Sequence, residues 1–234
     1  MQAADNDALR RIPSREEIKD TVFSMSADGA PGPDGFGAGF YRSCWSMIQD
    51  NLYLAVKDFF QGRQQPRGFS NTAIVLIPKL VGASRWRDFR PISLCNVSFK
   101  ILSKILASRI NHLLPKLISP WQAGFVPGRS ISDNILPAQE LALDLDRQLN
   151  HPNLILKLDM EKAYDRLEWS FLIFMLHQYG FEEWSVDLLF RTLSNCLFSL
   201  LINGVPAGFF MSSRGVHQGD SVTTSLLPSA NPRV

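Results

Sequence analysis

An aspartate and a tyrosine five residues apart are the side chains of this sequence best placed to do chemistry. They are Asp159 and Tyr164, in the segment LILKLDMEKAYDRLEW at residues 154–169. The apolar residues of 154–158 predict a strand that is buried on at least one face. A carboxylate at the carboxyl end of such a strand meets solvent and suits a hard cation such as Mg²⁺. The alternative is that Asp159 only ends the strand.

The same segment predicts the start of a helix. Asp165 and Glu168 have the spacing of a capping box ahead of an apolar run at 169–179. We assign Asp165 a structural role as the helix cap.

Other segments carry groups that bind phosphate or allow close approach to a ligand. Lys79 ends the run IVLIPK, and DFRPISL holds Arg90 before a proline. Lysine supplies a point charge and arginine a bidentate fork, which together suit a triphosphate. In GVHQGD, residues 215–220, the amide of Gln218 precedes Gly219, which permits close backbone approach. Taken singly, each of these segments also fits an ordinary surface role.

Composition and charge distribution set the size and the partners of the molecule. The chain has 234 residues, 45% of them hydrophobic, enough for one large domain or two small ones. Its net charge of +2 hides an excess of basic residues within segment 79–116 and an excess of acidic residues within segment 140–190. These two regions suit polyphosphate on one wall of a site and metal ions on the other. Two ordinary solvated surfaces are the alternative.

The cellular compartment is indicated by cysteine usage and hydropathy. The three cysteines, Cys44, Cys95 and Cys196, are isolated in the sequence and predict a reducing intracellular location. The first residues contain no apolar stretch of a signal peptide, and no apolar run approaches 18 residues. We therefore expect no signal peptide and no membrane span.

Many helices with few scattered strands predict an α+β fold rather than a doubly wound sheet. A strand over 72–77 should end at Pro78, and Asn203-Gly204 between two apolar runs predicts a type I′ hairpin. The glycines and prolines of 29–35 exclude regular structure there. Residues 122–129 are expected to form a loop. Helices are expected over 14–25, 40–60, 98–114, 135–149, 169–179 and 182–192.

The order of the motifs resembles the reverse transcriptases of non-LTR (long interspersed element) retrotransposons. The motifs run PGPDGF, LIPK, DFRPISL, KILSKILASRI, QAGFVPGRS, LDMEKAYDRLEW, NG and RGVHQGD, and span roughly residues 14–220. The resemblance implies an RNA-directed DNA polymerase of nuclear location, with an RNA template, a DNA primer and dNTPs as partners and no membrane. It implies a right-hand polymerase with a helical lead-in over 1–30, fingers over 31–152, a partial palm over 153–220 and a divergent tail over 221–234.

The resemblance also implies roles for single residues in a two-metal nucleotidyl transfer. Asp159 would bind both Mg²⁺ ions, and the backbone carbonyl of Met160 would be a further ligand. Tyr164 would lie beneath the incoming sugar and exclude a 2′-hydroxyl. Lys79 and Arg90 would bind the triphosphate.

Template contacts are implied in the same way. Gln218 and Gly219 would position the template base and the nucleotide. PGPDGF and QAGFVPGRS resemble template-contacting parts of the fingers, with Arg129 as a phosphate contact. Apart from the resemblance, most Trp and Phe residues are expected in the core, and Trp121 or Phe125 is a candidate to stack on a base.

The sequence departs from the family after Asp220. Relatives continue with a proline and an apolar helix, whereas this chain reads SVTTSLLPSANPRV, which does not predict that helix. The family's aromatic-Ala-Asp-Asp motif and thumb are absent, so the resemblance is truncated and the palm sheet should be incomplete. With one of three metal-binding carboxylates, the rate should fall by at least about 10³–10⁴. The sequence identifies no partner that would supply the missing palm.

Two other interpretations of the chain stay open. In the first, the chain is a non-catalytic nucleic-acid-binding remnant whose binding is salt-sensitive and does not depend on Asp159. In the second, the chain is a pseudogene product that does not fold stably, because the strand of Asp159 lacks its partner hairpin. A group II intron maturase fits less well, since KAYDRLEW and DFRPISL are closer to the retrotransposon form.

Overall fold

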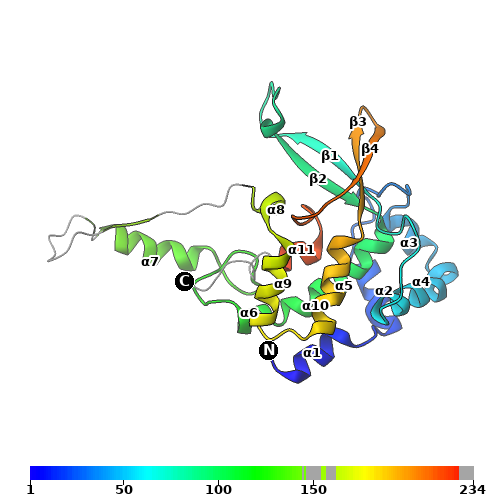
Figure 1. Ribbon diagram of the computed structural model, residues 1–234, viewed down its shortest axis with the longest axis horizontal. Coiled ribbons are helices and arrows are strands. Elements are labelled where there is room, and N and C mark those ends of the chain that lie inside the picture. The colour runs from blue at the N-terminus through cyan, green and yellow to red at the C-terminus, as the bar shows by residue number, and fades with distance from the viewer. Residues whose placement is uncertain (144, 146–153, 157–161, 227–234) are drawn as a thin grey trace.

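The computed structural model describes residues 1–143, 145, 154–156 and 162–226, and shows a body of helices with a four-stranded sheet (Figure 1). The strands are β1 (Thr72–Pro78), β2 (Phe89–Cys95), β3 (Leu197–Ile202) and β4 (Val205–Met211), and the 3₁₀ turn η1 (Trp86–Asp88) precedes β2. The helices are α1 (Ala3–Arg10), α2 (Arg15–Phe23), α3 (Ala38–Ser43), α4 (Trp45–Phe60), α5 (Val97–Asn111), α6 (Leu114–Leu117), α7 (Ser132–Leu143), α8 (Ala163–Arg166), α9 (Trp169–Gln178), α10 (Glu183–Ser194) and α11 (Ser221–Leu226). A mixed fold of helices and one sheet is thereby confirmed.

The sheet has the strand order β2-β1-β3-β4 and joins segments far apart in the sequence. β1 and β2 pair antiparallel along their whole length, from Thr72 opposite Cys95 to Pro78 opposite Phe89. β1 and β3 pair in parallel only at Thr72–Ile74. The two hairpins are therefore joined at their base and diverge beyond it (Figure 1).

The predicted strand and hairpin are confirmed, and one strand was not expected. β1 ends at Pro78. In the β3–β4 turn Asn203 has φ +51° and Gly204 has φ +81°, as a type I′ turn requires. The additional strand is β2, which contains Pro91. Proline is tolerated there because β2 is an edge strand, where one side of the backbone has no strand partner.

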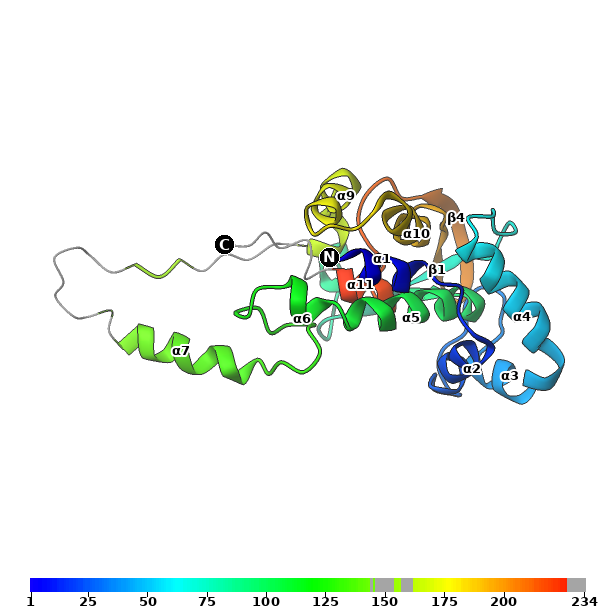
Figure 2. The same ribbon diagram turned by 90° about the horizontal axis from the view of Figure 1, so that it is seen from below.

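Helix α5 lies at the centre of the core. The side chains of Ile101, Leu102, Ile105, Leu106 and Ile110 are completely buried. Helices α1, α2, α6 and α11 pack against it, and Figure 2 shows α1 and α11 along it. One cluster of buried apolar side chains includes members of α1, α2, α4, α5, α9, α10 and α11. The first and last described segments thus share one core.

The Arg109 side chain joins four helices near the end of α5. Its guanidinium donates two hydrogen bonds of 2.9 Å to the Glu17 carboxylate of α2. It also donates to the carbonyl of Leu9 in α1, at 2.9 Å, and to that of Arg11. The guanidinium carbon, Cζ, lies 5.0 Å from the centre of the Phe60 ring of α4. Because only 9% of the side chain is exposed, this charge depends on Glu17 and the carbonyls for its stabilisation.

The expected helices form, with adjusted limits. The Ser14 hydroxyl caps α2 by accepting the N–H of Glu17 at 3.1 Å, as the capping box predicts. The helix expected over 40–60 is divided at Cys44 into α3 and α4. α7 covers the first part of 135–149, and positions 144 and 146–149 lie outside the described residues. Among the helices that the structure describes, none is long and apolar enough to cross a bilayer.

The segment after Asp220 forms a helix that the sequence did not predict. Val222 and Leu226 are four residues apart in α11, and both are completely buried against the core. The Asp220 carboxylate accepts the N–H of Thr223 at 3.3 Å and so caps the helix. A cap and one apolar pair are sufficient here, although the expected proline and apolar run are missing.

The predicted strand at 154–158 is wrong for the part that the structure describes. Leu154, Ile155 and Leu156 have no regular secondary structure, and their side chains are 84%, 54% and 73% exposed. A strand needs a neighbour to satisfy its backbone groups, and in the described sheet these three residues have none. The remaining positions, 157 and 158, lie outside the described ranges.

Replacing Arg109 by methionine should lower the free energy of unfolding by about 3 kcal/mol, because the Glu17 carboxylate and two carbonyls lose their donor. Arg15→Met is the matched control. Arg15 pairs with Asp50 at 2.5 Å, but the two side chains are 52% and 74% exposed, so the loss should stay below about 1 kcal/mol. Urea denaturation measures both variants, and equal losses would contradict the role assigned to Arg109.

Candidate nucleotide and template site

The loop 215–219 is held between helix α8 and strand β2. The N–H of Val216 donates to the Tyr164 carbonyl at 2.7 Å, and the Trp169 indole N–H donates to the Gly215 carbonyl at 2.7 Å. At the other end, the N–H of Ser93 in β2 donates to the Gln218 carbonyl at 3.0 Å. The main chain of this loop therefore bridges the two elements without relying on its own side chains.

Glycine is required at the first position of the loop. Gly215 has φ +80°, and a Cβ there would lie 2.8 Å from the carbonyl oxygen of Tyr164. Gly219 has φ +104° and lies against Ser93, whose carbonyl oxygen would be 3.6 Å from an added Cβ. Gly215 thus lets the loop approach α8 closely, whereas Gly219 supplies a positive φ that other residues rarely adopt.

A cavity of about 170 Å³ lies beside this loop. Tyr164 and Gln218, assigned from the sequence to the sugar and the template base, both line it. On one wall the rings of Phe198 and Phe210 stack with their centroids 5.6 Å apart. A phenol, an amide and apolar ring faces around one small cavity suit a flat base or a sugar.

Lys79 and Arg90 lie at the outer end of the β1–β2 hairpin and do not line this cavity. Arg90 pairs with Ile77, and the N–H of Lys79 donates to the Asp88 carbonyl at 2.8 Å. Both side chains are exposed. Arg90 is three residues along β2 from Ser93, a span of roughly 10 Å. The register brings the two bases close to each other at this end of the hairpin, outside the cavity.

The basic excess of 79–116 divides into two groups in the structure. On α5 and α6, four bases bond to carbonyls or carboxylates within residues 1–30 and hold that segment on the core; these are Lys100, Lys104, Arg109 and Lys116. The other four are on the β1–β2 hairpin, namely Lys79, Arg85, Arg87 and Arg90. The outward positive charge of this region is thus concentrated on the hairpin.

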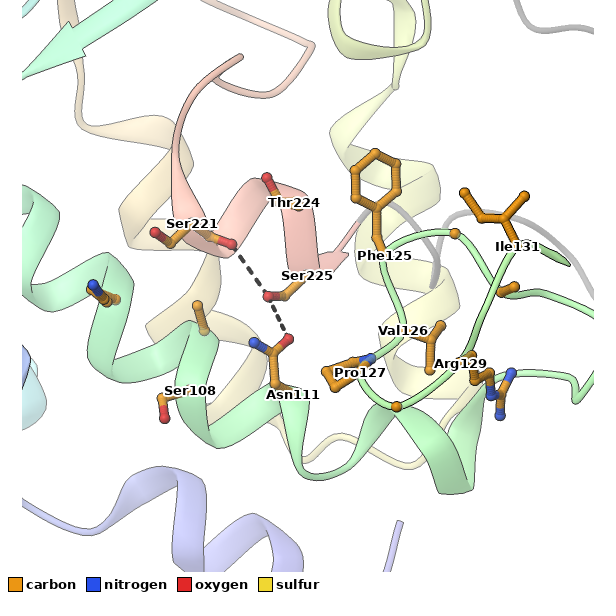
Figure 3. Close-up of a pocket in the computed structure, with 15 residues that line it drawn as sticks. Ser108, Asn111, Phe125, Val126, Pro127, Arg129, Ile131, Ser221, Thr224 and Ser225 are labelled. Atoms are coloured by element: carbon orange, nitrogen blue, oxygen red, sulfur yellow. Dashed lines mark hydrogen bonds between the residues drawn. The ribbon is translucent and has the colours of Figure 1, made fainter. Parts of the chain in front are cut away.

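A larger groove of about 760 Å³ lies between α5, the loop 123–131 and α11 (Figure 3). Phe125 rises from the loop with φ +61°, an unfavourable backbone for an aromatic residue, and is 59% exposed. From α11 the Ser225 hydroxyl donates to Oδ1 of Asn111 at 2.8 Å. An exposed ring beside a hydroxyl-lined wall suits a single nucleic-acid strand.

Arg129 supports the loop 123–131 from within. One terminal nitrogen donates to the carbonyls of Ser119 and Gln122, the latter at 2.7 Å. The other donates to the carbonyls of Pro115 at 3.2 Å and Ile118 at 3.0 Å. The two terminal nitrogens of Arg129 therefore support the loop, and the phosphate contact expected of Arg129 stays a prediction.

Two titratable side chains are buried where the loop meets α11. His217 and Asp220 are each 4% exposed. Burial lowers the pKa of His217, and the charge of Asp220 opposes this effect. In the described part of the chain, neither Nε2 of His217 nor Oδ1 of Asp220 has a hydrogen-bond partner. The imidazole packs instead against Phe198, with centroids 5.1 Å apart, and its Nδ1 lies 4.0 Å from Sγ of Cys196.

Asp159 and Met160, the predicted Mg²⁺ ligands, lie outside the described residues. Within the described ranges, no group of three or more His, Cys, Asp or Glu side chains is placed to hold a metal ion. Asp165 does not cap α9, contrary to the prediction. It lies inside α8, and the extended residues Leu167 and Glu168 separate α8 from α9, so that Glu168 occupies the cap position without a side-chain bond.

The chain resembles known proteins over most of its length. Residues 77–227 match the family described as reverse transcriptase (RNA-dependent DNA polymerase). The chain is 28% identical over 211 residues to the transposon TX1 uncharacterized 149 kDa protein of Xenopus laevis, covering 90% of this chain and 16% of that protein. It is 32% identical over 209 residues to the Pol polyprotein of the type-2 retrotransposable element R2DM of Drosophila melanogaster, covering 86% of this chain and 18% of the relative. The chain therefore spans less than a fifth of the length of either relative.

Lowering the pH from 7.5 to 5.5 should destabilise the protein through His217. Its pKa is lowered in the folded state, so below the ordinary value of 6.5 the unfolded state binds the extra proton first and stability falls with pH. The loss is at most about 1.4 kcal/mol per pH unit. Urea midpoints at the two pH values measure it. His217→Gln should reduce this pH dependence and His112→Gln, at an exposed position, should not; the same slope in all three proteins would contradict the role of His217.

Proposed function

This chain belongs to the reverse transcriptase family, as a reverse transcriptase domain of the non-LTR retrotransposon type, and we propose that it holds the template base and the incoming deoxynucleotide for RNA-directed DNA synthesis. The observation that carries the proposal is the anchoring of loop 215–219 by Tyr164 and Ser93. These bonds place Tyr164 and Gln218 on one cavity.

At this cavity each side chain has a distinct task. The ring of Tyr164 lies beneath the deoxyribose and occupies the space that a 2′-hydroxyl needs. Gln218 and Gly219 position the template base against the nucleotide. Lys79 and Arg90, at the outer end of the β1–β2 hairpin, bind the triphosphate through a point charge and a bidentate fork.

In this proposal residues 31–152 are the fingers and 153–220 a partial palm of a right-handed polymerase. Support comes from the sheet, in which β1 and β2 of the first segment continue into β3 and β4 of the second. The RNA template follows the groove beside Phe125 towards loop 215–219. From the family resemblance we expect this activity in the nucleus.

Mg²⁺ would be held by Asp159 and the carbonyl of Met160, where it would neutralise charge on the reacting phosphates. The sequence contains no adjacent pair of aspartates to complete a two-metal site. We therefore expect this chain to bind template and nucleotide but to polymerise little by itself.

A second function, nucleic-acid binding without catalysis, is favoured by the four outward bases of the β1–β2 hairpin. Contacts of this kind are electrostatic, so binding of RNA or DNA should weaken as salt rises. In this alternative, Asp159→Ala leaves the binding unchanged and no nucleotide is incorporated under any condition.

With Mg²⁺, dNTPs and a primed RNA template, the 234-residue chain should extend the primer at least about 10³-fold more slowly than a complete reverse transcriptase, because one carboxylate replaces three. Gel analysis of a labelled primer measures this. Any slow extension should disappear in Asp159→Ala and persist in Asp133→Ala, a change at an exposed position of α7. Robust synthesis would contradict the expected inactivity.

Tyr164→Ala should reduce the preference of the chain for dATP over ATP by roughly tenfold, since the ring no longer fills the space of the 2′-hydroxyl. Competition of each nucleotide against a fluorescent dATP analogue, with primer and template bound, measures the preference without requiring turnover.

Tyr164→Phe is the matched control for this measurement. It keeps the ring and should keep the preference. A wild-type chain that binds both nucleotides equally, or an alanine variant that discriminates as well as the wild type, would show that Tyr164 does not select the sugar.

A further inference from the structure

The tip of the β1–β2 hairpin, residues 79–90, combines positive charge with an exposed aromatic ring. Its bases are Lys79, Arg85, Arg87 and Arg90, and its one acid is Asp88. The Trp86 side chain is 78% exposed, in a part of the chain that projects away from the helical body (Figure 1). The tip thus presents an aromatic ring and positive charge to solvent together.

The backbone that carries this ring is fixed by Asp88. The Asp88 carboxylate accepts the N–H groups of Arg85 at 2.9 Å and Ser84 at 3.3 Å. The N–H of Asp88 donates to the Arg85 carbonyl at 2.8 Å, which closes the turn η1 around Trp86. From the opposite strand, Nζ of Lys79 donates to the Arg87 carbonyl at 2.9 Å. The ring is therefore presented on a turn that is already ordered, which lowers the entropy cost of binding.

The carboxylate of Asp88 at the tip faces the hairpin itself and not a ligand. Both oxygens of Asp88 face the hairpin itself: Oδ2 accepts the two N–H groups, and Oδ1 lies 3.9 Å from Nε of Arg87. Only 20% of this side chain is exposed, against 70% of Arg87. The surface offered to solvent is thus a ring flanked by guanidinium groups.

We propose that the hairpin tip binds an unpaired polynucleotide strand, with a base stacked on Trp86 and the neighbouring phosphates held by Arg85 and Arg87. Every base has a π face, so stacking on tryptophan tolerates any sequence, while guanidinium groups bind the phosphates. A duplex offers its ring faces only at its ends, so the tip distinguishes single strands from duplexes. The inference rests on the proposed function, in which the strand is template that has not yet reached the cavity.

The test is the affinity of the full chain for a labelled 12-nucleotide oligouridylate, measured by fluorescence anisotropy at low salt. Trp86→Ala should weaken binding by roughly 5- to 150-fold, the effect of losing one stacked base. Trp86→Phe, which keeps a smaller ring, should lose less. Met47→Ala removes an equally exposed apolar side chain from α4, at 80% exposure, and should bind as the wild type does. Because Trp86 is outside the core, the melting temperature should not change in any variant.

Two further ligands and one further variant test whether the tip binds single strands specifically and whether Trp86 is the stacking ring. An oligodeoxyuridylate should lose affinity in Trp86→Ala as the oligouridylate does, whereas a relaxed circular DNA duplex, which has no ends, should bind equally to both proteins. A similar loss for the duplex would show that the ring does not distinguish single strands from duplexes, and would overturn the stacking of an unpaired base. Trp121 has nearly the same exposure, 77%, on a different loop. A loss of oligouridylate affinity in Trp121→Ala, with no loss in Trp86→Ala, would overturn the assignment of the stacking ring to Trp86.

Failure of this inference is distinguishable from failure of the proposed function. If Trp86→Ala binds the oligouridylate as tightly as the wild type does, the binding role of the hairpin tip is overturned and the proposed function is not. A wild-type chain that binds neither single strand at low salt overturns both.

Discussion

The amino-terminal helices keep their places because one guanidinium is buried. Arg109, on the central helix α5, bonds Glu17 of α2 and carbonyls at the end of α1, and stacks on Phe60 of α4. A buried charge with this many partners fixes the helices laterally, which non-directional apolar packing does not. At the other end of α5, the amide of Asn96 accepts the N–H of Asp34 and donates to the Gly68 carbonyl. The loop 29–35 and the segment before β1 are thus attached to the same helix.

The candidate site is positioned by main-chain bonds rather than by its side chains. Loop 215–219 is tied to Tyr164 on one side and Ser93 on the other, and both bonds use peptide groups. This leaves the amide of Gln218 and the ring of Tyr164 available to line the cavity. It also accounts for His217 within this loop: its side chain packs at the base of the sheet, between Phe198 and Cys196.

The fold assigns two different tasks to one basic stretch of sequence. Lys100 and Lys104 project from α5 towards carbonyls of residues 24 and 30, so their charge stabilises the packing of the first thirty residues. The bases of the hairpin have no such oxygens within reach, except where Lys79 and Arg87 contact the hairpin itself. A polyanion would therefore meet positive charge at the tip of the sheet and aromatic surface beside it.

The sequence by itself determined the local structure of this protein and its family. The Ser14 cap of α2, the apolar stripes and the Asn203-Gly204 turn depend on neighbours a few residues away, and the order of the motifs identified the reverse transcriptase family. Tertiary structure decided what depends on distant partners. Pro91 is compatible with a strand because β2 lies at an edge of the described sheet, and 154–156 stay outside that sheet because none of its four strands pairs with them. α11 forms because Val222 and Leu226 meet the core, and Arg129 faces inward because four carbonyls surround its guanidinium. Such contacts join residues that the sequence separates, so only the folded chain shows which charges are used internally and which remain for a ligand.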